Sequence, residues 1–221
     1  MNAKLVGFFS GFPARQFTDS IAEVLKEELT VRDSLVFITT WPDSYAQNDE
    51  DADGMHHMFV ERNIPFAKHS VIDNRTEAEE ALKLVREANC IFLMGGNATL
   101  QHDLMRRKGI LDEIRQSSAV ILGVSAGSMN MGKQVVDIYE SLTPYEGLGF
   151  ADLTIKAHYP LEEDILQAVK QVSMELPVCL MEDESAIFIK KGSISLIGQL
   201  YRMVKGEIWP LTQEQLERMV Q

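Results

Sequence analysis

Residues 119–128 read Ala-Val-Ile-Leu-Gly-Val-Ser-Ala-Gly-Ser and constrain the fold more than any other stretch of the chain. The short apolar run is typical of a buried strand. It ends in Gly-x-Ser-x-Gly, the spacing of a nucleophile elbow, in which Gly123 and Gly127 let Ser125 turn sharply between a strand and a helix. We therefore expect the hydroxyl of Ser125 at the carboxyl end of a sheet, beside helical N–H groups that favour developing negative charge. The same spacing also fits a turn in which the serine only caps the helix.

Strands and helices alternate through the first half of the chain. Apolar runs predict strands at residues 4–9, 34–40, 67–72, 90–94 and 119–124, separated by helices at 16–29, 51–62, 76–87 and 100–108, with a polar loop at 41–49. This alternation predicts an α/β fold with a mostly parallel sheet, in which ligands bind at the carboxyl ends of the strands.

The C-terminal part of the chain predicts shorter elements. We expect a strand at 153–157, a helix at 162–175, a strand at 178–181, antiparallel strands at 185–189, 193–197 and 200–204, and a helix at 212–220. The antiparallel strands are expected to cover an edge of the sheet. Because no linker or repeat interrupts the pattern, residues 1–221 are predicted to form one domain.

Composition excludes several classes of partner. The formal net charge is −12, which disfavours nucleic acid and anionic membrane surfaces, since both bind basic patches. No run of 18 apolar residues is present, and the N-terminal residues are expected to form a strand rather than a signal peptide. Cys90 and Cys179 each lie in an apolar run, which predicts buried reduced thiols and a cytoplasmic protein. Whether the chain forms a homo-oligomer stays open.

One segment imitates a metal site. Asp49, Asp51, Asp53 and Gly54 repeat the opening of a calcium loop, but Val60 occupies the twelfth position, where a glutamate ligand belongs. An acidic helix start explains these residues better. We expect neither a metal nor a cofactor.

A second glycine turn and one histidine complete a candidate catalytic site. Gly95 and Gly96 follow the strand before the elbow strand, so their backbone N–H groups and that of Ala126 are candidates for holding an oxyanion, while Asn97 can cap the next helix. Of the five histidines, only His158 follows Ser125, and it lies at a predicted strand end, where its imidazole could act as a base.

A third group should be a carboxylate that orients the imidazole. Asp137, Glu140, Glu146 and Asp152 all lie between Ser125 and His158, and the residue pattern does not choose among them.

Three segments taken together resemble the peptidase E and cyanophycinase family of serine peptidases. They are Met94-Gly95-Gly96-Asn97, residues 123–130, and Gly147-Leu148-Gly149 leading to Ala157-His158-Tyr159. The resemblance implies a three-layer, doubly wound fold similar to that of class I glutamine amidotransferases (flavodoxin-like). It also implies a nucleophilic Ser125, a basic His158 and an acid at Glu140, with Asp137 as the alternative.

The chain departs from the family pattern on both sides of His158. Lys156-Ala157 stands where the family usually has a proline before the histidine, and the acidic segment 160–164 replaces the basic segment of aspartyl dipeptidases. The sequence thus predicts a serine peptidase acting on small peptides but gives no support for Asp-X dipeptides or cyanophycin. Two alternatives are an esterase of the α/β-hydrolase type and a binding module that keeps the fold without catalysis.

Overall fold

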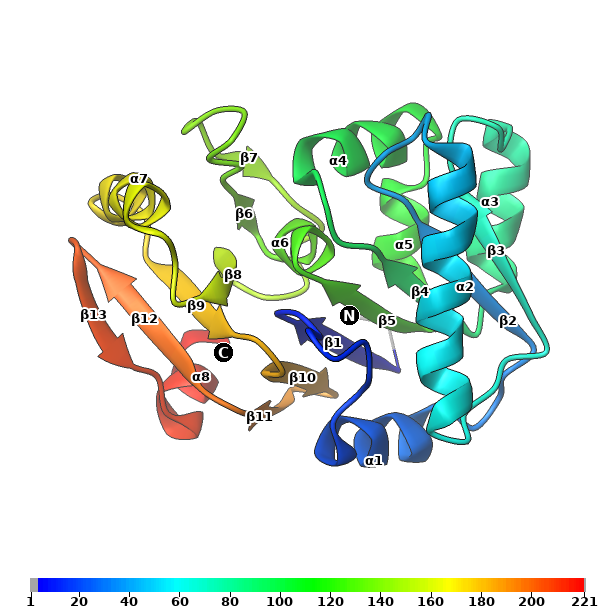
Figure 1. Ribbon diagram of the computed structural model, residues 1–221, viewed down its shortest axis with the longest axis horizontal. Coiled ribbons are helices and arrows are strands. Elements are labelled where there is room, and N and C mark those ends of the chain that lie inside the picture. Colours follow the sequence, from blue (N-terminus) through cyan, green and yellow to red (C-terminus); the bar gives the residue numbers. More distant parts are fainter. Residues whose placement is uncertain (1–3, 221) are drawn as a thin grey trace.

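A seven-stranded sheet forms the centre of the computed structural model, which describes residues 4–220 (Figure 1). The strand order is β11-β10-β1-β5-β4-β2-β3. The bounds are β1 Leu5–Phe9, β2 Ser34–Ile38, β3 Lys68–Ile72, β4 Cys90–Leu93, β5 Val120–Val124, β10 Ala186–Lys190 and β11 Ser193–Ile197. Strands β1 to β5 run parallel, whereas β10 is antiparallel to β1 and β11 to β10. The C-terminal hairpin therefore extends the sheet beyond β1.

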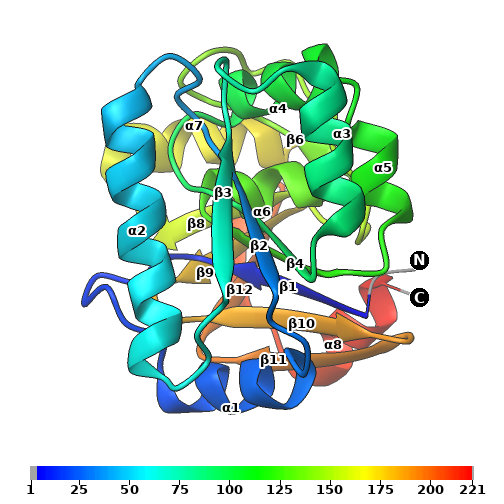
Figure 2. The same cartoon turned by 90° about the vertical axis from the view of Figure 1, so that its right-hand side faces the viewer.

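Helices cover both faces of this sheet (Figure 2). Their bounds are α1 Asp19–Glu28 and α2 Tyr45–Glu61 on one face, and α3 Ala78–Glu87, α4 Ala98–Arg107, α5 Leu111–Gln116 and α6 Ala126–Met131 on the other. Alternate side chains of one strand enter opposite cores: Leu35 and Phe37 pack toward α1 and α2, and Val36 and Ile38 toward α3 to α6. Burying each such side chain contributes about 1.5–3 kcal/mol, which explains why the strands are continuous apolar runs.

A second, smaller sheet stands beside the first, in the order β13-β12-β9-β8. Its strands are β8 Ile155–Tyr159, β9 Val178–Glu182, β12 Leu200–Val204 and β13 Glu207–Pro210. Strand β8 runs parallel to β9, and helix α7 (Glu163–Ser173) covers them through Val169. The remaining elements are the short pair β6 (Gln134–Val135) and β7 (Tyr145–Glu146), and helix α8 (Gln213–Val220), which contacts β11.

The predicted fold class is confirmed, with local corrections. Helix α5 and the strands β6, β7 and β13 are additional to the predicted elements, and residues 200–204 pair with β9 instead of covering an edge of the main sheet. Helix α2 begins at Tyr45, inside the predicted loop. Its polar first turn has no apolar periodicity, because the buried residue there is Asn48, which accepts a hydrogen bond from Thr39 and donates one to the Trp41 carbonyl. Within residues 4–220, no helix combines the length and apolar character needed to cross a bilayer.

Candidate active site

Ser125 lies in a sharp turn between β5 and α6, as the Gly-x-Ser-x-Gly pattern predicts. Its φ of 51° and ψ of −111° are values that L residues rarely adopt, and its N–H donates to the Phe9 carbonyl at 3.0 Å. A Cβ at Gly123 would lie 2.8 Å from the carbonyl carbon of Gly127, and a Cβ at Gly127 would collide with the Leu93 carbonyl. Both glycines are therefore required by the close backbone approach around the serine.

The imidazole of His158 contacts the serine hydroxyl directly. Its Nε2 lies 2.9 Å from Oγ of Ser125. His158 belongs to β8 and has a φ of 64°, at a register shift between Lys156 and Tyr159. This local irregularity lets the ring turn toward the main sheet although the strand belongs to the second one.

Asp183 is the carboxylate that meets the other ring nitrogen of His158. Its Oδ1 lies 2.7 Å from Nδ1, which fixes which ring nitrogen faces Ser125. Asp183 directly follows β9, and Tyr159 of β8 is in register with Glu182 of β9. Because the two strands are parallel neighbours, the residues at their carboxyl ends meet at one edge.

The predicted acids Glu140 and Asp137 do not contact the His158 ring, and this expectation is corrected. Glu140 accepts a hydrogen bond from Nδ2 of Asn97 at 2.8 Å. Asp137 accepts from the backbone N–H and the hydroxyl of Thr99, at 3.2 and 3.1 Å. Both carboxylates thus hold residues 136–144 against the start of α4. Asp183 is the middle residue of the acidic run Glu182-Asp183-Glu184 that follows the predicted strand 178–181, and the run marks the strand end without showing which carboxylate faces His158.

Ser10 and Gly11 brace the His158–Asp183 pair from the end of β1. The fully buried Ser10 hydroxyl donates to the Met181 carbonyl at 2.9 Å and accepts from the N–H of His158 at 2.8 Å. A Cβ at Gly11 would lie 2.6 Å from Cε1 of His158 and would also strike the Asp183 carboxylate. The residue pattern gave no sign of either role, because both depend on contacts with the distant strands β8 and β9.

Of the candidate oxyanion groups, Gly95 and Ala126 lie next to Ser125, and Gly96 lies against Thr40 and Trp41. A Cβ at Gly95 would be 3.5 Å from Cβ of Ser125, so this turn abuts the serine. Gly96 has a φ of +132°, and a Cβ there would lie 2.8 Å from Nε1 of Trp41. Ala126 opens α6, so its N–H precedes the intrahelical hydrogen bonds. The predicted cap is confirmed, since Oδ1 of Asn97 accepts from the Leu100 N–H at 2.8 Å.

Lys156, one of the departures from the family pattern, is almost completely buried. Burial lowers the pKa of its ammonium group, while the nearby Asp137 opposes that shift. Nζ lies 5.0 Å from the centre of the Tyr139 ring. This cation–π contact connects β8 with residues 136–144.

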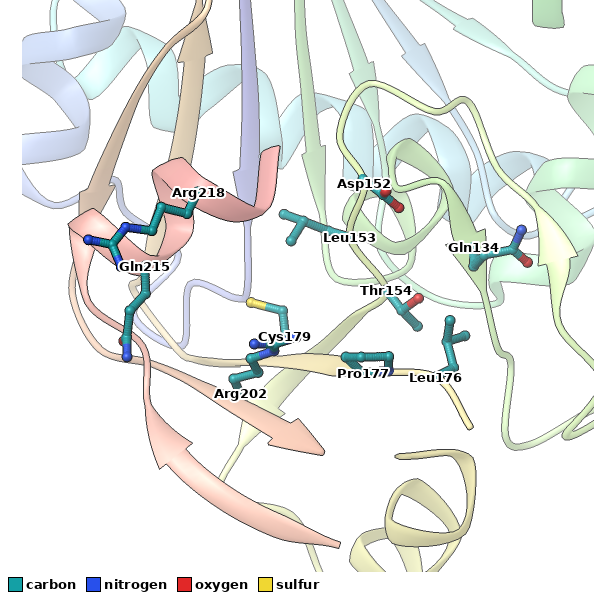
Figure 3. Close-up of a pocket in the computed structure, with 10 residues that line it drawn as sticks. All are labelled: Gln134, Asp152, Leu153, Thr154, Leu176, Pro177, Cys179, Arg202, Gln215 and Arg218. Carbon is teal, nitrogen blue, oxygen red and sulfur yellow. The ribbon is translucent and has the colours of Figure 1, made fainter. Parts of the chain in front are cut away.

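A separate cavity of about 620 Å³ lies among β9, β12 and α8 (Figure 3). Cys179 and Arg202, register partners on neighbouring strands, both line it, and Nε of Arg202 is buried there without a partner. Burial raises the pKa of the Cys179 thiol to about 12, so this group is a poor nucleophile at neutral pH. The described residues that line the cavity do not include Ser125, His158 or Asp183.

Two solved structures share the fold. A peptidase from an acI-B1 Actinobacterium matches with a TM-score of 0.72 at 13% identity, over 95% of this chain and 94% of that one. A putative peptidase E protein from Listeria monocytogenes EGD-e matches with a TM-score of 0.67 at 17% identity, over 88% of this chain and 98% of that one. No curated protein matches the sequence.

The model of peptidase family S51 matches residues 10–197, a range that contains Ser125, His158 and Asp183. This match covers far more than half of the chain. It favours neither the α/β-hydrolase esterase nor the non-catalytic module considered above. The chain belongs to peptidase family S51 and is a serine-type peptidase.

Proposed function

We propose that Ser125, His158 and Asp183 are the catalytic triad of a peptidase that hydrolyses small peptides. One observation carries the proposal: the unbroken series of contacts from the Ser125 hydroxyl through both nitrogens of His158 to the Asp183 carboxylate, at 2.9 and 2.7 Å. Each contact falls within the hydrogen-bond range expected between a nucleophile, its base and the group that orients the base.

In this mechanism, His158 Nε2 removes the proton of Ser125 as Oγ attacks the peptide carbonyl. The same nitrogen then gives that proton to the leaving amine, and a water molecule repeats the sequence on the acyl-enzyme. Asp183 accepts the Nδ1–H and stabilises the imidazolium without taking its proton. Backbone N–H groups of Gly96 and Ala126 hold the oxyanion, where such donors are worth about 10²–10³-fold in turnover.

The substrate class and the location are also proposals. The family and the exposed His158–Ser125 pair support small peptides as substrates. The acidic start of α7, with Glu163 and Asp164 in its first turn, gives no cation for an acidic substrate side chain. The buried free thiols of Cys90 and Cys179 support a cytoplasmic location.

The nucleophile is tested by Ser125→Ala, with Ser118→Ala at an exposed position as the matched control. We expect Ser125→Ala to abolish both peptide hydrolysis and labelling by a fluorophosphonate, since removing such a nucleophile costs about 10⁶-fold in turnover. The Ser118→Ala variant should behave as the parent does. Hydrolysis or labelling that survives Ser125→Ala would contradict the mechanism, and Ser125-dependent cleavage of esters but no amides would contradict the peptide substrate.

A further inference from the structure

A groove of about 210 Å³ adjoins the candidate nucleophile. Val124 and Phe12 line it. Val124 immediately precedes Ser125, and Phe12 immediately follows Gly11, the glycine that lies against the His158–Asp183 pair. Two lining residues of the groove are therefore chain neighbours of residues in the candidate active site.

The far wall of the groove is one face of α2. Gly54, Met55 and Met58 follow one another at helical spacing along that face, and all three line the groove. With Phe12 and Val124 they make up the apolar half of the lining. The methionine side chains are flexible enough to fit occupants of different shape.

Gly54 is the observation that points to an occupant. Glycine is unfavourable inside a helix, yet this one stands in the middle of a 17-residue helix and needs no special backbone conformation. A Cβ at Gly54 would meet no atom of the described chain within 4 Å. Packing within the protein thus does not exclude a larger residue, whereas any side chain at this position would narrow the groove.

We propose that this groove is the subsite for an apolar substrate side chain, such as Met or Leu, on a residue that flanks the scissile bond; the inference rests on the proposed function. The volume is below the roughly 300–1,000 Å³ of pockets that enclose a whole small-molecule ligand, so it suits one side chain of a longer substrate. Arg15, Glu50 and Asp51 also line the groove and are exposed, with charges of both signs. These polar groups suit the backbone and termini of a short peptide better than a single charged side chain.

The test uses two series of unblocked dipeptides, X-Ala and Ala-X, with X being Met, Leu, Ala, Asp or Lys. We expect kcat/KM for Met or Leu to exceed that for Ala, Asp and Lys by about 10- to 100-fold in one series, as is usual for an apolar subsite. Gly54→Phe should reduce this preference to within about threefold, because its ring would occupy the space proposed for the Met or Leu side chain. Ala46→Phe, an equally large change at an exposed α2 residue off the groove, should leave the preference unchanged.

Two results would overturn the subsite: a preference for Asp or Lys in both series, or an apolar preference that persists in Gly54→Phe. If no peptide is hydrolysed in a Ser125-dependent manner, the proposed function fails and the subsite is decided by binding. Calorimetry would then compare Met- and Ala-containing dipeptides on Ser125→Ala and on the Ser125→Ala, Gly54→Phe double variant. The subsite is supported if Ser125→Ala binds the Met peptide more tightly than the Ala peptide and the double variant does not. It is overturned if Ser125→Ala binds both peptides equally.

Discussion

Oδ1 of Asp183 lies 2.7 Å from Nδ1 of His158, although 25 positions separate the two residues in the chain. The contact exists because β8 and β9 are parallel neighbours whose carboxyl ends coincide. The main sheet supplies Ser125, and the second sheet supplies the base and the acid. The candidate site therefore lies where the carboxyl ends of strands from two sheets meet.

Replacing each carboxylate in turn should distinguish Asp183 from Glu140 as the acid that orients His158. We expect Asp183→Asn to lower kcat by about 10³- to 10⁴-fold, because an amide no longer holds the correct His158 tautomer or stabilises the imidazolium. Glu140→Gln should stay within about threefold of the parent, since Glu140 contacts Asn97 instead. Steady-state kinetics on both variants measures these losses. A large loss of kcat in Glu140→Gln with little loss in Asp183→Asn would identify Glu140 as the acid instead.

Ser10 is predicted to be a positioning residue. Ser10→Ala removes the acceptor for the His158 N–H and the donor for the Met181 carbonyl, which should cost about 1–3 kcal/mol of unfolding free energy. It should also lower kcat more than it changes KM, because the imidazole loses its fixed place.

Ser173→Ala provides the matched control for Ser10→Ala. Ser173 is a buried serine on α7 whose hydroxyl likewise donates one hydrogen bond, to Lys170, and accepts one, from Gly206. We expect a similar loss of stability but an unchanged kcat. Equal kcat losses in the two serine variants, measured on folded protein, would show that Ser10 acts only through stability.

Gly11→Ala tests the space behind the histidine. The new methyl group would occupy the position now taken by the His158 ring and the Asp183 carboxylate, so one of them must move. We expect at least about a 10²-fold loss of kcat, the effect typical of a 1 Å misplacement. Gly149→Ala, at a site where a Cβ meets no neighbour but φ is +72°, adds backbone strain without a clash and should lower stability while leaving kcat unchanged. A fully active Gly11→Ala variant would contradict the close packing of this pair.

Stability should fall at mildly acidic pH because of two histidines outside the candidate triad. Burial lowers the pKa of His56, with a further contribution from the nearby His69, and burial also lowers the pKa of His102. The unfolded chain then binds protons more readily than the folded one below a pH of about 6.5, so the unfolding free energy falls as pH decreases through that range.

Urea denaturation between about pH 5 and 8 measures this dependence. His56→Gln and His102→Gln should each make the unfolding free energy fall less steeply as pH decreases, because each removes a group that resists protonation in the fold. His57→Gln serves as the control on the same helix, at an exposed position. If the unfolding free energy falls as steeply with decreasing pH in both variants as in the parent, other groups cause the pH dependence.

The parts of the site that could be predicted are those specified by neighbouring residues. The turn at Ser125 needs glycines two positions away on each side. Asn97 caps α4 by accepting a hydrogen bond from the N–H of Leu100, three residues further on, so both features are readable in short stretches. The nearness of the Gly95–Gly96 turn to Ser125 follows from the parallel pairing of β4 and β5, whose carboxyl ends lie together. His158 reaches Ser125 from the second sheet, which that rule does not cover.

Asp183 could not be assigned in the same way, because its role depends on which strand lies beside β8. Residue spacing does not report strand order, and the pairing of β9 with both β8 and β12 is set by packing under α7. The start of α2 shows the same limit, since the buried amide of Asn48 replaces the apolar side chain that would have marked the helix. Local patterns predict elements well, and contacts between distant elements decide the rest.

The order of the site residues along the chain has a consequence for biosynthesis. A ribosome completes the strand, turn and helix around Ser125 well before it reaches residue 183 and the hairpin of β10 and β11 that returns to β1. Until residues 158 and 183 have emerged and β8 has paired with β9, the growing polypeptide holds a serine with no oriented imidazole beside it. The contact between Ser125 and His158 therefore forms after the turn that presents the serine has been synthesised.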